Sequence, residues 1–351
     1  MTDFARPGRT PTMQDVARAA GVATSTVSRA FARPGRVSSE TARRIHEAAS
    51  VLGYHVNPIA QALQAGRTSM IALVISDVTN PFHNEIIRGA QATAAEAGYT
   101  LLLSDAQESS AQERETLERA VAAVDGIVLA TSRMPDSSIR TIAKQRPVVL
   151  LNRALVDVPC VVTDNPGGAR HAAAHLAELG HERVTYLAGP EASWVDGMRW
   201  RTLRENAPLL GLHARRLGPY APTVAGGRAA AAEFVHHPTS AVIAYNDLMA
   251  IGFIRALAAH GAHVPRDVSV IGFDNIFPAA LVTPALTTVA APLRHMGRTA
   301  VHNLLAIVRG AQPRSQEPVT LPARLVVRAS TTARSQQRSL HGRDLMTGAR
   351  R

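Results

Sequence analysis

The chain has 351 residues, of which 46% are hydrophobic, so it can form a small domain joined to a larger core and is too apolar for wholesale disorder. Its single cysteine, Cys160, excludes an internal disulfide and a cysteine-based metal cluster. No apolar run approaches the roughly 18 residues of a membrane span, and the N-terminus lacks a signal-peptide core. We therefore expect no membrane partner and a cytoplasmic location.

Positive charge is concentrated at the two ends of the chain. The formal net charge is +11. Residues 1–67 carry nine Arg against four Asp or Glu, which gives +5, and residues 334–351 carry five Arg against one Asp, which gives +4. The middle keeps +2 (11 − 5 − 4). This distribution suits a head that meets phosphate and a basic, disordered tail, which either adds nonspecific DNA affinity or has no role.

The first predicted elements are two short helices joined by a tight turn. Apolar residues recur at i, i+3, i+4 and i+7 over 13–20, which predicts one buried helix face. Thr12 and Asp15 can cap the start of this helix, and Gly21 supplies the turn that a helix-turn-helix requires. The second helix has an inner face of Val27, Ala30 and Phe31.

The outer face of the second helix is polar. Thr24, Ser25, Ser28 and Arg29 are left pointing outward, and short polar side chains together with arginine can meet base edges and phosphates. The pattern therefore indicates a DNA-reading helix. A third helix follows Ser38 and ends at Gly53.

Residues 57–67 predict a short fourth helix. Asn57 followed by Pro58 looks like an N-cap with proline at the first helical position. The segment is too short to be stable alone in water, so it could form on the duplex with Leu63 as a wedge in the minor groove. An ordinary linker helix, with Leu63 packed on the neighbouring domain, fits the spacing equally well.

The head is similar to that of the LacI/GalR family of bacterial repressors. The resemblance extends to about Ser330, and its motifs in the head are Asp15-Val16-Ala17, Gly21-Val22, Thr26-Val27-Ser28-Arg29, Val37-Ser38-x-x-Thr41 and Leu52-Gly53-Tyr54-x-x-Asn57. It implies a homodimer on a pseudo-palindromic double-stranded DNA operator, with paired hinge helices in the minor groove. The DNA-binding residues it implies are Thr12, Thr24, Ser25, Thr26, Ser28, Arg29, Arg36, Tyr54, Asn57, Gln61 and Leu63.

From residue 68 the chain alternates short apolar runs with amphipathic stretches, which predicts α/β folding with parallel sheets and helices on both faces. The expected strands are 71–75, 101–103, 127–129, 148–151, 160–162, 184–187, 241–244 and 268–271. Ligands of such folds bind beyond the carboxyl ends of the strands. Polar residues follow several of these runs at 77–82, 152–153, 164, 246–247 and 273–275. As a set they favour a site for a hydroxyl-rich ligand.

The resemblance makes this site more specific. Leu179-Gly180-His181, Asn246-Asp247-x-x-Ala250-x-Gly252 and Ile271-Gly272-Phe273-Asp274 are similar to the family's effector domain, which resembles periplasmic sugar-binding proteins. It implies Arg199, Asn246 and Asp274 as polar anchors, Tyr220 as an aromatic platform, and a cleft lined by Phe82, Asn152 and Asp164. Ser193 and Val195 replace the arginine and threonine of purine-responsive relatives, so a sugar is favoured over a nucleobase.

The domain organisation implied is an all-α helix-turn-helix head at 1–56, a hinge helix and linker at 57–67, and a periplasmic-binding-protein-like core of two doubly wound α/β subdomains at 68–333. The N-subdomain comprises 68–163 plus 292–321, and the C-subdomain comprises 164–291 plus 322–333. The tail is 334–351.

These patterns favour a ligand-responsive transcriptional regulator, most simply a repressor of carbohydrate-metabolism genes that a small sugar releases from its operator. A non-sugar effector and a co-repressor mode stay open. A transport-type sugar-binding protein would not need residues 12–67, and phosphate-loop, dinucleotide and hydrolase motifs are absent from the sequence. His171 and His175 share a helix face but have no implied acidic or cysteine partner, so neither a metal nor a cofactor is expected.

Overall fold

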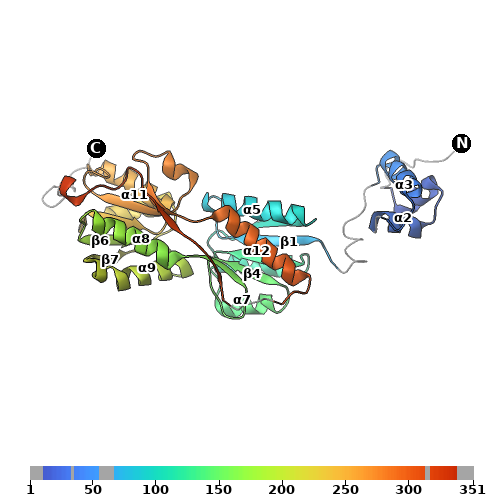
Figure 1. The fold of residues 1–351 in the computed structure, drawn as a ribbon, viewed down its shortest axis with the longest axis horizontal. Coiled ribbons are helices and arrows are strands. Elements are labelled where there is room, and N and C mark those ends of the chain that lie inside the picture. The colour runs from blue at the N-terminus through green and yellow to red at the C-terminus, as the bar shows by residue number, and fades with distance from the viewer. Residues whose placement is uncertain (1–10, 33–34, 55–66, 313–316, 338–351) are drawn as a thin grey trace. The chain divides into compact units, whose positions relative to one another are not determined.

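The computed structural model describes residues 11–32, 35–54, 67–312 and 317–337 (Figure 1). The chain divides into two compact units, Met1–Ser69 and Met70–Arg351, and each is described by itself. The predicted hinge helix, with Asn57, Gln61 and Leu63, lies outside the described residues.

The first unit is a three-helix head, as predicted. Its helices are α1 (Met13–Ala20), α2 (Thr24–Ala32) and α3 (Ser39–Leu52). They meet around Val16, Val27 and Ile45, none of which has exposed surface. Gly21 ends α1 with a φ of 63°, a left-handed conformation that glycine adopts without strain, and this residue turns the chain from α1 toward α2.

The second unit contains two six-stranded sheets flanked by helices. The first sheet is wholly parallel, in the order β11-β5-β4-β3-β1-β2. Its strands are β1 (Met70–Ile75), β2 (Thr100–Asp105), β3 (Gly126–Ala130), β4 (Val148–Leu151), β5 (Cys160–Thr163) and β11 (Val319–Leu321). Its helices are α5 (Phe82–Glu96), α6 (Ser110–Ala120), α7 (Asp136–Ala143) and α12 (Leu293–Val308).

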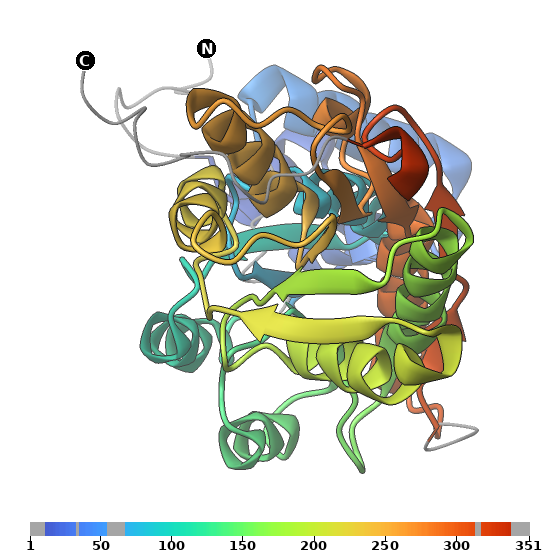
Figure 2. The same ribbon diagram turned by 90° about the vertical axis from the view of Figure 1, so that its left-hand side faces the viewer.

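The second sheet has the order β12-β10-β9-β8-β6-β7, and only the β10–β12 pair is antiparallel. Its strands are β6 (Arg183–Leu187), β7 (His213–Leu217), β8 (Ala241–Ala244), β9 (Ser269–Asp274), β10 (Thr287–Ala290) and β12 (Arg324–Val326). Its helices are α8 (Asn165–Glu178), α9 (Trp194–Asn206), α10 (Val224–Phe234) and α11 (Asp247–Ala259). Figure 2 shows α8 and α9, in green to yellow-green, on one side of β6 and β7, and α10 and α11, in yellow to orange, on the other.

The chain crosses from one sheet to the other three times. It leaves the first sheet after β5, returns after β10 to form α12 and β11, and leaves again before β12. All eight predicted strands are present, and the two parallel-sheet α/β subdomains confirm the predicted fold class. All but one of these apolar runs became central strands, because helices cover both faces of a parallel sheet and its central strands exclude polar side chains; the exception is β2, at the edge of the first sheet.

The first residues of the predicted C-terminal tail are structured. Residues 334–336 form a short 3-10 turn, and the backbone N–H of Arg334 donates to the carbonyl of Leu179 at 2.8 Å. The side-chain amide of Gln337 donates to the carbonyls of Ser240 and Pro265 at 3.1 and 3.2 Å. The expectation of a disordered arm from residue 334 is therefore wrong for 334–337, because this segment is hydrogen-bonded to the second sheet's subdomain.

Within the described ranges, no helix is both long and apolar enough to cross a membrane.

Stability should depend on pH through His181, which precedes β6. Its ring nitrogens lie 2.9 Å from the hydroxyl of Ser240 and 3.1 Å from that of Ser269, and burial lowers its pKa to about 4. Between pH 6.5 and 4, His181 therefore binds a proton in the unfolded chain but not in the folded chain. We expect the unfolding free energy to fall across this window by about 3 kcal/mol from His181 alone.

Urea unfolding of the wild type and of His181→Gln between pH 7.5 and 4 measures this effect. The variant should be less stable at pH 7.5 but lose less stability on acidification. His83, whose pKa burial also lowers to about 4, gives a residual slope in both proteins. Equal slopes for the two proteins would show that His181 does not titrate as expected.

Candidate DNA-reading face and effector cleft

The outer face of α2 presents the polar side chains that the sequence singled out. Thr24, Ser25 and Arg29 are exposed, and Thr26 and Ser28 are half-buried. The Arg29 guanidinium lies back along the helix, with Nε donating to the carbonyl of Ser25 at 3.1 Å. The inner face, through Val27 and Ala30, is buried against the other helices, so only the polar face of α2 is left for a ligand.

The other predicted contacts of the head lie at the helix ends and in the connection before α3. Thr12, which precedes α1, is exposed, and its backbone N–H donates to the Asp15 carboxylate at 2.9 Å. Arg36 is exposed. Tyr54 follows α3 and is half-buried, with its ring 6.0 Å from that of Phe31. The DNA-binding roles of these residues stay predictions.

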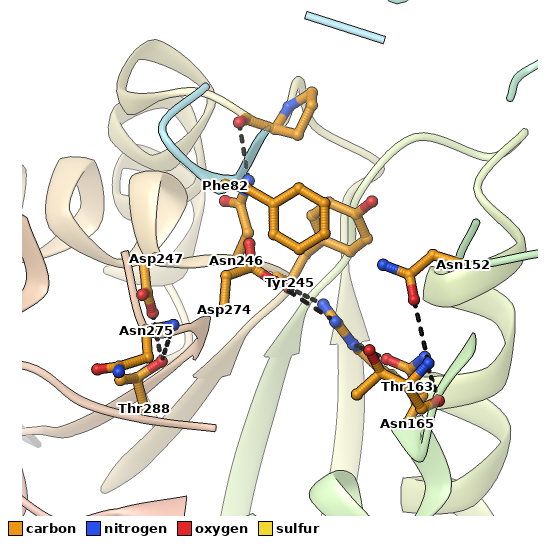
Figure 3. Close-up of polar contacts among 12 residues, drawn as sticks. Phe82, Asn152, Thr163, Asn165, Tyr245, Asn246, Asp247, Asp274, Asn275 and Thr288 are labelled. Atoms are coloured by element: carbon orange, nitrogen blue, oxygen red, sulfur yellow. Dashed lines mark hydrogen bonds and ion pairs between the residues drawn. The ribbon is translucent and has the colours of Figure 1, made fainter. Parts of the chain in front are cut away.

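A cleft of about 360 Å³, including space open to solvent, lies between the two sheets of the second unit. Residues from the first sheet's subdomain and from the second's line it together, and they include five of the seven residues predicted for the effector site (Figure 3). These five are Phe82, Asn152, Arg199, Asn246 and Asp274. A smaller pocket of about 260 Å³ is bordered by four of the same residues, Phe82, Asn152, Arg199 and Asp274.

Arg199, on α9, connects three other elements. Its Nε donates to Oδ1 of Asn165 at 2.9 Å, one terminal nitrogen donates to the backbone carbonyl of Tyr245, and the other lies 3.7 Å from Oδ1 of Asp274. The flat face of the guanidinium lies 3.9 Å from the ring centroid of Phe273. The side chain is 7% exposed, so these contacts replace the hydration that a buried charge loses.

Asp274 ends β9 in a backbone conformation that non-glycine residues rarely adopt, with a φ of 104°. The residues after it are held from both sides. Asn275 N–H donates to the hydroxyl of Thr288 at 3.3 Å, and Ile276 N–H donates to the buried carboxylate of Asp247 at 2.9 Å. Burial raises the pKa of Asp274 to about 6, while Arg199 opposes this rise. At neutral pH the carboxylate is therefore mostly ionised and accepts hydrogen bonds.

Two asparagines in the cleft also form hydrogen bonds with the backbone. Asn246 caps α11, with Oδ1 accepting from Met249 N–H at 2.9 Å and Nδ2 donating to the carbonyl of Pro222 at 3.0 Å. Asn152 follows β4 with a φ of 53°, and its Oδ1 accepts from Thr163 N–H at 3.2 Å. Each amide keeps one lone pair and at least one N–H for a ligand.

Two aromatic residues line the larger cleft, and Tyr220 is not one of them. Tyr220 lines neither the larger cleft nor the smaller pocket, and its hydroxyl donates to Glu233, so its role as the aromatic platform stays a prediction. Phe82 and Tyr245 are the aromatic residues that line the larger cleft. Tyr245 follows β8 directly, one residue before Asn246, and its position at the end of a predicted strand was the signal that could have identified it.

Asp164 borders only the smaller pocket, where its Oδ1 caps α8 by accepting from Gly167 N–H at 2.8 Å. Its neighbour Asn165 was missed by the sequence analysis. Asn165 is 1% exposed, and it orients the Arg199 guanidinium through the 2.9 Å bond to Nε. Nothing in the spacing of the sequence distinguishes these two residues, because both lie in the first turn of the helix.

The predicted histidine pair on α8 does not gather ligands for a metal. Nε2 of His175 lies 3.0 Å from the hydroxyl of Thr331. Among the described residues, no group of three or more His, Cys, Asp or Glu side chains is arranged to hold a metal ion.

A helix-turn-helix head and a two-sheet core with a polar cleft define a class of protein, the DNA-binding regulators that carry a periplasmic-binding-protein-like domain. Comparison with protein families agrees. Residues 12–57 match the family of bacterial regulatory proteins of the lacI family, and residues 173–331 match the periplasmic binding protein-like domain.

The chain belongs to the lacI family of transcriptional regulators. It is 33% identical over 332 residues to the HTH-type transcriptional repressor CytR of Escherichia coli K12. The alignment covers 92% of this chain and 96% of CytR. It is 31% identical to the transcriptional regulator GalR of the same organism, over 94% of this chain and 98% of GalR.

Solved structures agree with this assignment. A lac repressor dimer bound to operator and the anti-inducer ONPF superimposes with a TM-score of 0.83 at 25% identity, covering 93% of this chain and all of that one. A LacI family regulator from Enterococcus faecalis V583 with bound ribose gives a TM-score of 0.68 at 30% identity, over 75% of this chain and 99% of that one.

The ion pair in the cleft can be tested by a double-mutant cycle. Arg199→Met leaves the Asp274 carboxylate buried without its cation, so we expect the unfolding free energy to fall by about 3 kcal/mol. Asp274→Asn should also destabilise, because the guanidinium loses its counter-charge. In the double variant both charges are gone, and its loss should be smaller than the sum of the two single losses.

Denaturant unfolding at pH 7.5 measures the four proteins. If the losses add within about 0.5 kcal/mol, the two side chains are not coupled.

Proposed function

We propose that this chain is a repressor that binds a pseudo-palindromic operator as a homodimer and is released by a small sugar. The observation that carries the sugar assignment is the cleft. It brings together two guanidinium groups, two carboxylates, three amides and the rings of Phe82 and Tyr245. Forked polar groups can each bond two neighbouring hydroxyls, while rings pack on the apolar face of a sugar. The ribose-bound regulator of E. faecalis, with the same fold, supports this class of ligand.

Two apolar surfaces of the core support the proposed dimer. At the edge strand β2, Leu102 and Leu103 are 38% and 45% exposed on opposite faces of the sheet, and beside the end of β9, Phe277 and Leu281 are 67% and 75% exposed. Large apolar side chains exposed in groups mark contact surfaces. The structural similarity to the lac repressor dimer on its operator supports the same conclusion. Twofold assembly would pair two α2 helices for two operator half-sites.

The proposed response follows from linkage between the two binding events. A sugar in the cleft contacts both subdomains, so it favours one relative orientation of them, and that orientation decides whether the dimer fits its operator. Such coupling usually amounts to about 1–3 kcal/mol and acts equally in both directions. A ligand that bound both orientations equally would change nothing.

The first experiment is a fluorescence-anisotropy titration of a labelled operator, taken from the DNA upstream of the protein's own gene, at fixed salt. We expect tight binding that D-ribose or another neutral sugar of a panel weakens by roughly tenfold to a hundredfold. Tight binding that no sugar changes would refute the sugar effector and leave the operator assignment in place. Binding that a sugar strengthens would instead indicate a co-repressor.

The role of α2 is tested by Arg29→Ala. A base contact is worth roughly 1–3 kcal/mol of discrimination, so operator affinity should fall about tenfold or more while affinity for a scrambled duplex changes little. Arg43→Ala is the matched control, because it also removes an exposed arginine of the head but one that pairs with Glu47 on α3. Equal losses on both duplexes would make Arg29 a phosphate contact rather than a base contact.

A further inference from the structure

The cleft contains a second ion pair, on the wall that belongs to the first sheet. Arg133 follows β3 and Glu108 follows β2, and both line the larger cleft together with Arg199 and Asp274. Arg133 Nε donates to Oε2 of Glu108 at 2.7 Å, with the two side chains 6% and 23% exposed. This pair is shorter than the Arg199–Asp274 pair, so the guanidinium of Arg133 is neutralised within the cleft itself.

The fold places Glu108 there in a strained conformation. Gln107 and Glu108 are consecutive non-glycine residues with φ values of 49° and 57°, in the left-handed region. Hydrogen bonds hold this turn in place. Glu108 N–H donates to the carbonyl of Ser76 at 2.6 Å, and Gln107 N–H donates to the Asp105 carboxylate at 3.2 Å. Strain of this kind persists where the surroundings fix it, and it concentrates at ligand-binding sites.

Arg133 is fixed from the other side. Its backbone N–H donates to the carboxylate of Glu113 at 2.9 Å, and Glu113 is 2% exposed. The backbone at Arg133 is therefore fixed, while its guanidinium, 6% exposed, is held by the 2.7 Å bond to Glu108.

The charges that line the two pockets leave no cation unmatched. The larger cleft has two arginines and two carboxylates, and its one histidine, His83, is neutral at physiological pH because burial lowers its pKa to about 4. The smaller pocket adds the carboxylate of Asp164 and no further cation. A phosphate or carboxylate group entering either pocket would meet guanidinium groups already neutralised and carboxylates that repel it.

The helix starts at the cleft are poor substitutes for a cation, because a side chain already takes up one of the free N–H groups of each. A free helix N-terminus attracts anions through its unpaired N–H groups. Here a side chain occupies each start: Asn80 Oδ1 accepts from Phe82 N–H at 3.0 Å, Ser193 Oγ from Asp196 N–H at 3.2 Å, and Asn246 Oδ1 from Met249 N–H at 2.9 Å.

We propose that the cleft selects an electrically neutral, hydroxyl-rich effector, and that Glu108 is the residue that excludes phosphorylated forms of the same sugar. This inference rests on the proposed sugar effector. Glu108 acts by neutralising Arg133, which would otherwise present a rigid, buried guanidinium suited to bind phosphate in a bidentate manner.

The test on the wild-type full-length protein uses matched probes: D-ribose with D-ribose 5-phosphate, D-glucose with D-glucose 6-phosphate, and cellobiose with its 6-phosphate. Binding is followed by isothermal titration at pH 7.5 and fixed ionic strength. We expect one neutral member to bind and its phosphorylated partner to bind at least tenfold more weakly. A phosphorylated member that binds more tightly overturns this inference but leaves a sugar effector. If no member of any pair binds, the proposed sugar effector is refuted, and the inference with it.

The role of Glu108 is tested by Glu108→Gln, which keeps the size and hydrogen-bonding capacity of the side chain and removes its charge. Arg133 then carries an unneutralised charge, and the affinity for the phosphorylated member should rise roughly tenfold relative to the neutral one. Glu85→Gln is the control, because it removes an exposed carboxylate paired with Arg294 at 2.8 Å outside both pockets.

In the double variant Glu108→Gln/Arg133→Gln the gain should disappear, because the cation has been removed as well. An unchanged preference in the folded single variant, or a gain that persists in the double variant, would refute the assignment to Glu108. The wild-type comparison of matched probes decides the charge of the ligand without any variant.

Discussion

The burial of one guanidinium constrains most of the architecture around the ligand cleft. Arg199 is a charge removed from water, and a buried charge is tolerated only when its hydrogen bonds and counter-charge are supplied by the protein. Those partners come from α8, from the carbonyl after β8 and from the end of β9, so the positions of three elements depend on the same side chain. These contacts preorganise the wall of the cleft that belongs to the second sheet, and a preorganised wall loses little entropy on binding.

Parallel sheets explain why residues from distant parts of the sequence meet here. In a parallel sheet the carboxyl ends of the strands lie at the same edge, and the chain turns away from the sheet there. Thr131, Asn152 and Asp274 make such turns with positive φ values of 59°, 53° and 104°, and all three line the cleft. The strain at these positions is balanced by the well-packed strands behind them, which are almost wholly buried.

The strands that composition defines could be predicted from the sequence, whereas the site residues whose roles depend on contacts with distant partners could not. Most of the predicted strands were visible because they are runs rich in Val, Ile and Leu. The edge strand β7, with the sequence His-Ala-Arg-Arg-Leu, and the threonine-rich β10 were missed because their side chains read as polar loop. Arg199 and Asp274 were predicted from family resemblance, whereas Asn165, Arg133 and Glu108 were not, because their importance comes from contacts between residues 25 or more positions apart. Tyr220 and Tyr245 could not be ranked without the fold.

The smaller pocket lies at the three places where the chain passes from one sheet to the other. Asp164, Ala291 and Ala323 each belong to one of these crossings, and all three border the pocket alongside Arg199 and Asp274. Glu108 and Arg133 line only the larger cleft, away from these crossings. In the proposed regulator, a replacement of Glu108 would therefore change which signal molecule is accepted without altering the segments that connect the two subdomains.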